Sequence, residues 1–398
     1  MDLLIISNYW HFLNEKSSSR YNTIAEMAVD SGCNVEVVTS SFYHTKKCQR
    51  NKEETIAEYP FTLIKESSYK KNVSIKRIIS HAGFAKGVVK YLAGRKKPDV
   101  IYLFVPPTGL AKKIVKFANK NKIKVIIDVL DLWPEAFEMV LPKIAKPLFA
   151  PIQKSAEYVY KNADDIVAVS KTYADKVEQY NTRGAKSLAV YIGTDLKVFD
   201  LYASNATDLN DKLRSITMAY IGMFGKSYDL IFVMRAMKEL IESGYDKIEF
   251  LVMGDGPRRE EFESYAVDNK LPVRFTGRLS YDDMVKKLVK CDFSINVLDE
   301  NSFASIINKH ADYLAAGKPT INVQKDKEFS NLILKYNAGF VSPLNDIESL
   351  KQHMKIFADD AEKRKEMGKN ARTVAEKFFD RNYTYPAIIE LIKNDKER

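Results

Sequence analysis

The sequence NKHADYLAAGKPTI, which spans residues 308–321, decides the fold of this chain. It begins as a helix with one carboxylate, Asp312, and Gly317-Lys318-Pro319 stops that helix. The β-branched run 320–323 follows at once and predicts a buried strand, as does the apolar run 293–297 before the helix. Apolar strands separated by a helix indicate a parallel sheet that helices cover on both faces.

The same alternation extends along the whole chain. In the second half the other predicted strands are 216–221, 248–253 and 273–276, and the predicted helices are 228–243, 258–268, 281–290 and 308–316. In the first half the predicted strands are 3–7, 35–40, 100–105, 125–129, 166–170 and 188–192, and the predicted helices are 21–30, 75–92 and 110–119. The pattern predicts an α/β protein with two doubly wound parallel sheets.

The domain boundaries are predicted from composition. A polar stretch rich in Asn and Asp, residues 200–215, is expected to link an N-terminal domain, 1–200, to a C-terminal domain, 201–370. Residues 356–393 have a helical pattern broken only near Pro386, and the last part, 371–398, is expected to pack back on the first domain.

Composition excludes several classes of protein. The 398 residues are 45% hydrophobic and 29% charged, which excludes a disordered or membrane-embedded chain, and no run approaches the roughly 20 apolar residues of a membrane span. The segment 1–7 is too short for a signal peptide. The three cysteines and five histidines form no metal-ligand pattern, so we expect no metal and a reducing, cytoplasmic location.

The net charge of +10 is concentrated in the first half. Residues 43–97 contain 14 Lys or Arg and four Asp or Glu, and residues 100–127 add six lysines and no acid. This pattern fits an anionic partner or a set of solvated helix faces. In the predicted helix 75–92, Ile75, Ile78 and Ile79 begin an apolar stripe with basic flanks, a pattern typical of a core face that also fits an anionic membrane.

The first strand excludes two common nucleotide-binding folds. It runs into Asn8-Tyr9-Trp10-His11 with no glycine, so neither a dinucleotide fingerprint nor a phosphate loop is present. Ser18 and Ser19 precede Arg20 at the start of the next helix, where they could cap the helix or, with Arg20, hold an anionic group of a substrate.

Three turns in the second half follow strand ends. Gly222, Gly225 and Lys226 lie in the first turn, Gly254 lies in the second, and Arg278 and Leu279 lie in the third. Glycines allow backbone N–H groups to approach a phosphate, and ligands of open α/β sheets bind beyond the carboxyl ends of the strands. The three turns therefore predict one ligand site.

These turns, with the helix 308–316, resemble the GT-B nucleotide-sugar glycosyltransferases, specifically the retaining glycosyltransferase family 4. The resemblance covers nearly the whole chain and implies two Rossmann-like domains facing a central cleft. It implies that the turn at Gly222 surrounds the donor diphosphate, that the turn at Leu279 borders the nucleobase, and that Asp312 takes the place of a Glu that binds the donor ribose. The sequence Asp131-Leu132-Trp133-Pro134-Glu135 resembles a motif of the members that build capsule, O-antigen or exopolysaccharide.

The chain departs from the family pattern at three places. Ala304 stands where a second carboxylate is frequent, Met223 replaces a frequent Arg, and Asp312 replaces Glu. We therefore expect Lys309 or Arg278 to meet part of the phosphate charge. The expected donor site consists of Gly222, Gly225, Lys226, Gly254, Arg278, Leu279, Lys309 and Asp312.

The resemblance also implies a reaction and an acceptor side. We expect transfer from a nucleotide sugar, UDP-linked, to a hydroxyl of a polyprenyl-diphosphate-linked saccharide, at the inner face of the cell membrane. Asp131, Glu135 and His11 are the candidate catalytic residues, although each could serve packing or a turn instead. The alternatives are a GT-B nucleotide-sugar epimerase and a nucleic-acid-binding protein, and the latter lacks aromatics interleaved with its lysines.

Overall fold

The computed structural model of the chain describes residues 1–15, 19–72, 74–138, 147, 149–181, 187–206, 216–302 and 304–394. It divides into two compact units. The first contains Met1–Tyr191 and Thr384–Arg398, and the second contains Ile192–Tyr383. The first unit is therefore built from both ends of the chain.

The first unit contains a parallel seven-stranded sheet in the order β5-β2-β1-β6-β7-β8-β9. Its strands are β1 (Asp2–Ser7), β2 (Asn34–Ser40), β5 (Phe61–Ile64), β6 (Val100–Val105), β7 (Lys124–Val129), β8 (Asp165–Ala168) and β9 (Ser187–Ala189). A short antiparallel pair, β3 (Phe42–Tyr43) and β4 (Cys48–Gln49), and a 3-10 turn, Lys52–Glu54, follow β2. The central strands are almost wholly buried because helices cover both faces.

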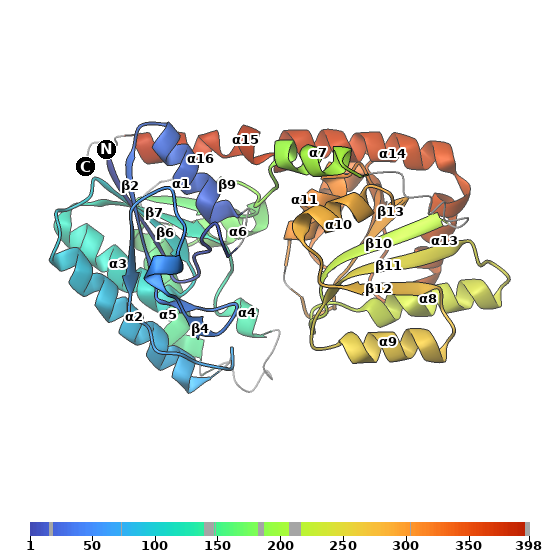
Figure 1. The fold of residues 1–398 in the computed structure, drawn as a ribbon, viewed down its shortest axis with the longest axis horizontal. Helices are drawn as coiled ribbons and strands as arrows, with labels where there is room; N and C mark the ends of the chain where they lie inside the picture. Colours follow the sequence, from blue (N-terminus) through green and yellow to red (C-terminus); the bar gives the residue numbers. More distant parts are fainter. Residues whose placement is uncertain are drawn as a thin grey trace. The chain divides into compact units, whose positions relative to one another are not determined.

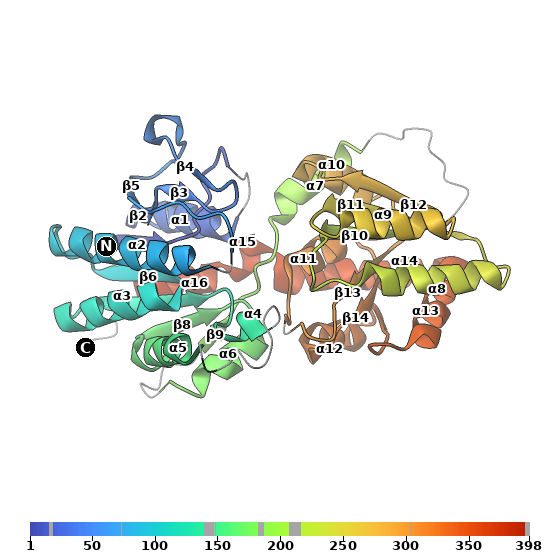
Figure 2. The same cartoon turned by 90° about the horizontal axis from the view of Figure 1, so that it is seen from below.

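Helices of the first unit lie on the two faces of this sheet (Figure 1). On one face, α1 (Arg20–Asp30) packs with α16 (Pro386–Lys393), whose Ile388, Ile389 and Ile392 join the same core cluster as Trp10 and Ile24. The other helices are α2 (Ile75–Ala93), α3 (Thr108–Asn121), α4 (Glu135–Glu138), α5 (Ala150–Asn162) and α6 (Lys171–Glu178). Figure 2 shows α2 beside α3, and α3 also packs on α5.

The second unit contains a parallel six-stranded sheet in the order β12-β11-β10-β13-β14-β15. The strands are β10 (Ile216–Met223), β11 (Ile248–Asp255), β12 (Val273–Gly277), β13 (Phe293–Val297), β14 (Thr320–Val323) and β15 (Gly339–Val341). The helices are α7 (Leu196–Ser204), α8 (Leu230–Glu242), α9 (Arg259–Asp268), α10 (Tyr281–Leu288), α11 (Asn308–Ala315), α12 (Lys327–Lys335), α13 (Ile347–Asp359), α14 (Ala361–Val374) and α15 (Arg381–Thr384). One large apolar cluster joins α8, α9 and α13 to one face, and a smaller one joins α10 and α11 to the other (Figure 1).

The two ends of the second unit are hydrogen-bonded to each other. The Thr194 amide donates to the Phe379 carbonyl at 2.8 Å, and Arg381 donates to the carbonyls of Ile192 and Gly193, both at 3.0 Å. Gly193 has a φ of +60°, and a Cβ there would overlap the Phe379 carbonyl oxygen. These hydrogen bonds hold side by side the two segments at which the chain enters and leaves the second unit.

Each sheet has a point where the strand order reverses. In the first sheet β1 lies between β2 and β6, and in the second β10 lies between β11 and β13. Loops that leave two such neighbouring strands diverge to opposite faces and leave room for a ligand at the carboxyl edge. The turns at Asn8 and Gly222 therefore occupy the natural ligand positions of their units.

Three sequence expectations need correction. The predicted linker, 200–215, begins inside α7, and its residues 207–215 lie outside the described residues. The predicted long helix, 356–393, is broken at Asp360 and Asp380, where a carboxylate accepts from backbone N–H groups of the following residues. Ile75, Ile78 and Ile79, whose pattern is typical of a core face and also fits an anionic membrane, are 76%, 64% and 64% exposed and lie outside the core.

No helix in the described parts of the chain has both the length and the apolar character needed to span a bilayer. Within the same residues no three His, Cys, Asp or Glu side chains come together as metal ligands would.

Candidate functional site

The glycine turns of the second unit meet at the carboxyl edge of its sheet. Gly222 closes β10 with a φ of +135°, a conformation that side chains other than glycine rarely adopt. A Cβ at Gly254 would overlap the Gly222 carbonyl oxygen. The ends of β10 and β11 therefore approach each other more closely than any residue other than glycine at position 254 would allow. Gly254 therefore positions the turn at the carboxyl end of β11, a role that the structure adds to the predicted approach of its backbone to a phosphate.

Lys309 on α11 lies beneath this turn. A Cβ on Gly222 would lie 3.0 Å from the Lys309 Nζ, so the glycine leaves room for the amine. Nζ lies 3.8 Å from the ring centre of Tyr220 and 4.0 Å from that of Tyr228. It has no hydrogen-bond partner among the described residues, and burial lowers the pKa of Lys309 well below its usual value.

An ammonium group without an anion is costly to bury. The two aromatic faces offset part of that cost, because their quadrupoles attract a cation. No carboxylate contacts Lys309 in the described chain, and an anion bound at the Gly222 turn would supply the missing countercharge.

Asp312 lies one turn further along α11 and is half-buried. The Tyr281 hydroxyl donates to its Oδ1 at 2.8 Å, and the same hydroxyl lies 2.7 Å from Thr194 Oγ1. Burial and the Asp312 charge raise the pKa of Tyr281, so this hydroxyl keeps its proton and holds the carboxylate. The neighbouring His310 is buried and stacked on Phe329 with ring centres 3.5 Å apart.

The other predicted donor residues lie on the rim. Lys226 and Arg278 are exposed, and Gly225 is half-buried in the Gly222 turn. Leu279 is partly buried and packs against the apolar cluster that contains Ile221 and Tyr313. The structure therefore brings the predicted donor set to one edge of one sheet, with Lys309 the most buried charge in it.

The first unit corrects the prediction for Arg20. Its guanidinium is 3% exposed and donates two hydrogen bonds to Asp128, at 2.7 and 3.2 Å. It also donates to the carbonyls of Val190 and Tyr191. Arg20 is thus committed to an internal ion pair and does not offer its charge to a substrate.

The serines before Arg20 give a similar result. Ser19 caps α1, since its Oγ accepts from the Asn22 amide at 3.3 Å, and it is buried. Ser18 lies outside the described residues. Of the two alternatives for Ser19, the structure shows the cap.

Asp131 follows β7 and is half-buried. Burial raises its pKa to about 6, while hydrogen bonds from the Leu132 backbone and the Trp133 side chain limit the shift. Glu135, at the start of α4, pairs with Lys176 at 3.1 Å. His11 is half-buried, with its ring 5.8 Å from that of Tyr43 and 6.0 Å from that of Tyr21.

A further cluster, which no sequence motif predicts, lies near the carboxyl edge of the first sheet. It contains the side chains of Tyr9, His44, Lys47, Tyr69, Arg77, His81 and Trp133, and we call it the basic aromatic cluster. The net charge of residues 43–97 was the only signal for it. Periodicity gives no indication that loop residues near 44 and 69 meet the start of α2.

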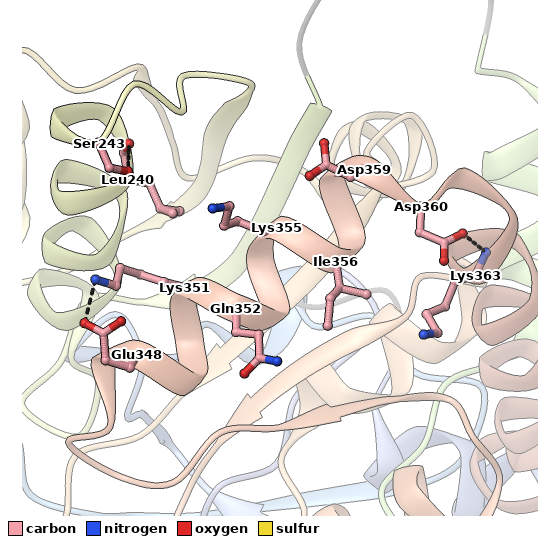
Figure 3. Close-up of a pocket in the computed structure, with 10 residues that line it drawn as sticks. All are labelled: Leu240, Ser243, Glu348, Lys351, Gln352, Lys355, Ile356, Asp359, Asp360 and Lys363. Atoms are coloured by element: carbon pink, nitrogen blue, oxygen red, sulfur yellow. Dashed lines mark hydrogen bonds and ion pairs between the residues drawn. The ribbon is translucent and has the colours of Figure 1, made fainter.

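A hollow of about 700 Å³ lies elsewhere in the second unit, between α8 and α13. Charged side chains of the hollow form ion pairs: Lys351 pairs with Glu348 (Figure 3) and also with Glu239, and Asp359 pairs with Lys247. None of the predicted donor residues lines it, and its lining holds as many lysines as carboxylates, so it carries no excess positive charge for a diphosphate. This hollow therefore does not compete with the carboxyl edge as the site.

Comparisons with known proteins agree with this geometry. Residues 205–374 match the family model of the glycosyl transferases group 1. An uncharacterized glycosyltransferase of Methanocaldococcus jannaschii, MJ1178, is 24% identical over 223 residues, which is 56% of this chain and 57% of that protein's length. The alignment thus spans little more than half of this relative.

Solved structures resemble the whole chain. Sucrose-phosphate synthase from Thermosynechococcus elongatus superposes with a TM-score of 0.75 at 13% identity, covering 98% of both chains. HepE of Anabaena in complex with UDP superposes with a TM-score of 0.72 at 13% identity, covering 98% of this chain and 99% of HepE. These neighbours are GT-B glycosyltransferases, which confirms the predicted fold class.

The family match coincides with the unit that contains Gly222, Lys309 and Asp312. The expected capsule or O-antigen type remains a prediction. The chain therefore has the GT-B fold, and its residues 205–374 match the glycosyl transferases group 1, which supports glycosyltransferase as the predicted enzyme class.

Proposed function

We propose that the chain transfers a sugar, with retention of anomeric configuration, from a UDP-sugar to a hydroxyl of a polyprenyl-diphosphate-linked saccharide. The donor half of this proposal rests on the buried Lys309 beneath the Gly222 turn, whose Nζ has no hydrogen-bond partner among the residues that the structure describes. HepE, solved with UDP and with UDP-glucose, supports a uridine nucleotide. We place the reaction at the cytoplasmic face of a bacterial membrane, in surface polysaccharide synthesis.

Different donor residues bind different parts of the nucleotide. Backbone N–H groups of the Gly222 turn and the Lys309 ammonium take the diphosphate, and they stabilise the charge that grows on it as the sugar leaves. Asp312, held by Tyr281, accepts from the vicinal hydroxyls of the ribose. We propose that these groups, with Lys226 and Arg278 on the rim, act without a metal.

The acceptor residues lie at the carboxyl edge of the first sheet. Asp131 has a pKa of about 6, so it is mostly ionised at pH 7 and can accept a hydrogen bond from the acceptor hydroxyl. We propose Asp131 as the residue that orients this hydroxyl. Glu135 is paired with Lys176 and holds the loop, and His11 contributes packing.

A thermal-shift titration with UDP tests the donor site. UDP should raise the melting temperature because it binds the folded state alone. Asp312→Ala should weaken UDP binding about 10- to 100-fold, since charge-assisted hydrogen bonds to two hydroxyls are lost. The affinity for inorganic diphosphate, which has no ribose, should not change. Equal losses for both ligands would contradict the ribose assignment, and no stabilisation by any nucleotide would contradict the proposed function.

Asp131→Asn tests the acceptor side. The substitution keeps the size of the side chain and should lower kcat about 100-fold while leaving the Kd for UDP unchanged. In the native protein, kcat should fall as the pH drops through about 6, because protonation removes the acceptor of the hydrogen bond. A pH profile of kcat in both proteins checks this, and an unaltered profile in the variant would assign the titration to another group.

A further inference from the structure

Two hydroxyl groups connect the Asp312 carboxylate to the start of the second unit. The Tyr281 hydroxyl has a single proton, which it donates to Asp312 Oδ1 at 2.8 Å. The same hydroxyl oxygen lies 2.7 Å from Thr194 Oγ1, so the proton of this second hydrogen bond comes from the threonine. The two bonds therefore run in one direction, from threonine through tyrosine to the carboxylate, and we call them the hydroxyl bridge.

The backbone of Thr194 is fixed at the place where the chain enters and leaves the second unit. Its amide donates to the Phe379 carbonyl at 2.8 Å, and its carbonyl accepts from the Arg381 amide at 3.0 Å. We call the two segments that meet here, residues 192–194 and 379–381, the junction. Thr194 and Arg381 are both buried, so solvent does not compete for these bonds.

Packing brings the three residues of the hydroxyl bridge together from separate elements. Thr194 precedes α7, Tyr281 begins α10, and Asp312 lies on α11. Helix α7 packs on α10, where the ring of Tyr202 lies 6.1 Å from that of Tyr281 (Figure 2). The bridge therefore joins the helix of the ribose carboxylate to the junction through side chains that the fold holds in place.

A second contact ties α7 to α11 without the hydroxyl bridge. Arg372 on α14 donates to both carboxylate oxygens of Asp200 on α7, at 2.7 Å each. It also donates to the carbonyl of Ala315, the last residue of α11, at 3.0 Å. Removal of one hydroxyl of the bridge should therefore leave the second unit folded, so its effect on binding can be measured.

Each bond of the hydroxyl bridge fixes the next one. Hydrogen bonds in series polarise one another in a buried setting, and a buried hydroxyl that loses its partner is costly to leave unpaired. A ribose that donates to Asp312 limits the orientations of this carboxylate, and with them those of the Tyr281 hydroxyl that donates to it. The same restriction extends to the side chain of Thr194, whose backbone is part of the junction.

We propose that Tyr281 and Thr194 are positioning residues, which hold Asp312 in the orientation that binds the donor ribose and couple that binding to the junction. This inference rests on the proposed function for the identity of the donor. The coupling is reciprocal: if the junction strengthens ribose binding through the two hydroxyls, a bound ribose stabilises the junction by the same factor. A nucleotide at Asp312 thus stiffens the place where the chain passes between its two units.

A double-mutant cycle on the full-length protein tests the positioning role. Tyr281→Phe and Thr194→Val each remove one hydroxyl and keep the shape of the side chain. Tyr281→Phe should weaken UDP binding about tenfold, and Thr194→Val about fivefold, since the threonine acts one bond further from the carboxylate. The double variant should bind UDP as Tyr281→Phe does, because Thr194 acts on Asp312 through the tyrosine.

Two comparisons separate positioning from a general loss of structure. Inorganic diphosphate has no ribose, so its affinity should be the same in the native protein and in all three variants. Tyr202→Phe is the matched control, because it removes a hydroxyl from the ring that packs against Tyr281. It should bind UDP and inorganic diphosphate as the native protein does.

Hydrogen exchange at the backbone amides of Thr194 and Arg381 tests the coupling, because both amides donate across the junction. Saturating UDP should slow their exchange about fivefold in the native protein, which equals the loss expected for Thr194→Val. Saturating inorganic diphosphate should not slow it. In Tyr281→Phe, saturating UDP should leave the exchange rates unchanged, because the hydroxyl bridge is broken.

Two results would overturn the proposal. One is additive losses of UDP affinity in the cycle, and the other is protection of the Thr194 amide by UDP that persists in Tyr281→Phe. The failure of the proposed function has a different signature. Without any ligand, Tyr281→Phe should already speed the exchange of both amides, since Thr194 loses its side-chain partner. A protein that shows this difference but binds no UDP would contradict the donor function and leave the link between Tyr281 and the junction in place.

Discussion

Lys309→Met should lower kcat/KM about 1000-fold and at the same time raise the stability of the ligand-free protein. The loss follows because the buried ammonium is the charge placed beneath the donor diphosphate turn. The gain follows because methionine fills the space between Tyr220 and Tyr228 without burying an amine that has no hydrogen-bond partner among the described residues. Sugar transfer and urea denaturation of the native and variant proteins measure the two effects.

The pH dependence of UDP binding sharpens this prediction. Burial lowers the pKa of Lys309 in the free protein, and a bound diphosphate raises it again, so binding takes up a proton and the affinity falls as the pH rises. The other titratable groups around Nζ do not contribute to this proton uptake, because Tyr220 and Tyr228 have raised pKa values and His310 has a lowered pKa. Calorimetry in two buffers with different ionisation enthalpies counts the proton.

Lys238→Met is the control, since it makes the same change on the exposed face of α8. It should alter neither UDP affinity nor proton uptake. If Lys309→Met bound UDP as tightly as the native protein, or lost stability instead of gaining it, the amine would not be the diphosphate ligand.

Asp128→Asn should destabilise the first unit by about 3–5 kcal/mol. The carboxylate is fully buried, accepts from Arg20 and Tyr102, and is the partner of a guanidinium that is itself buried. Removal of its charge leaves Arg20 desolvated without a countercharge, and such a change costs far more than the pair contributes. Because Trp10 and Trp133 both belong to the first unit, urea denaturation followed by tryptophan emission reports on this unit alone.

Two further variants complete the measurement. Lys171→Met breaks an exposed pair with Asp175 and should cost less than about 1 kcal/mol. The double variant Arg20→Met/Asp128→Leu removes both charges, so its cost should be smaller than the sum of the single changes. A cost of Asp128→Asn below about 1 kcal/mol would show that solvent reaches the pair.

The sheets and the donor edge could be predicted from the sequence because their signals are local. Continuous apolar runs mark central strands, and the glycines at 222 and 254 stand where one strand end must approach the next. β5 has no such run, because all four of its residues are only partly buried at the sheet edge. The local hydrophobic pattern therefore did not predict this strand, whose residues are only partly buried.

The partners of charged residues could not be predicted in the same way. Arg20 and Asp128 are 108 residues apart, and nothing in either segment shows that they meet. The periodicity of α2 fits a core face as well as a membrane face, and it does not show that Ile75 and Ile78, in the first turn, are exposed. The departures from the family pattern predict Lys309 for the donor site, but its position between two tyrosines follows only from the fold.

The close approach of Gly193 to the Phe379 carbonyl, beside the Thr194–Phe379 hydrogen bond, affects the order in which the two units fold during synthesis. Since the second unit begins and ends at adjacent points, it is an insertion within the first, and it can form while its two ends stay together. The first unit is completed later, because Tyr385, Ile388 and Ile392 join the core around Trp10 and leave the ribosome after the whole second unit. During synthesis the N-terminal sheet therefore remains open on one face until the second unit has been made.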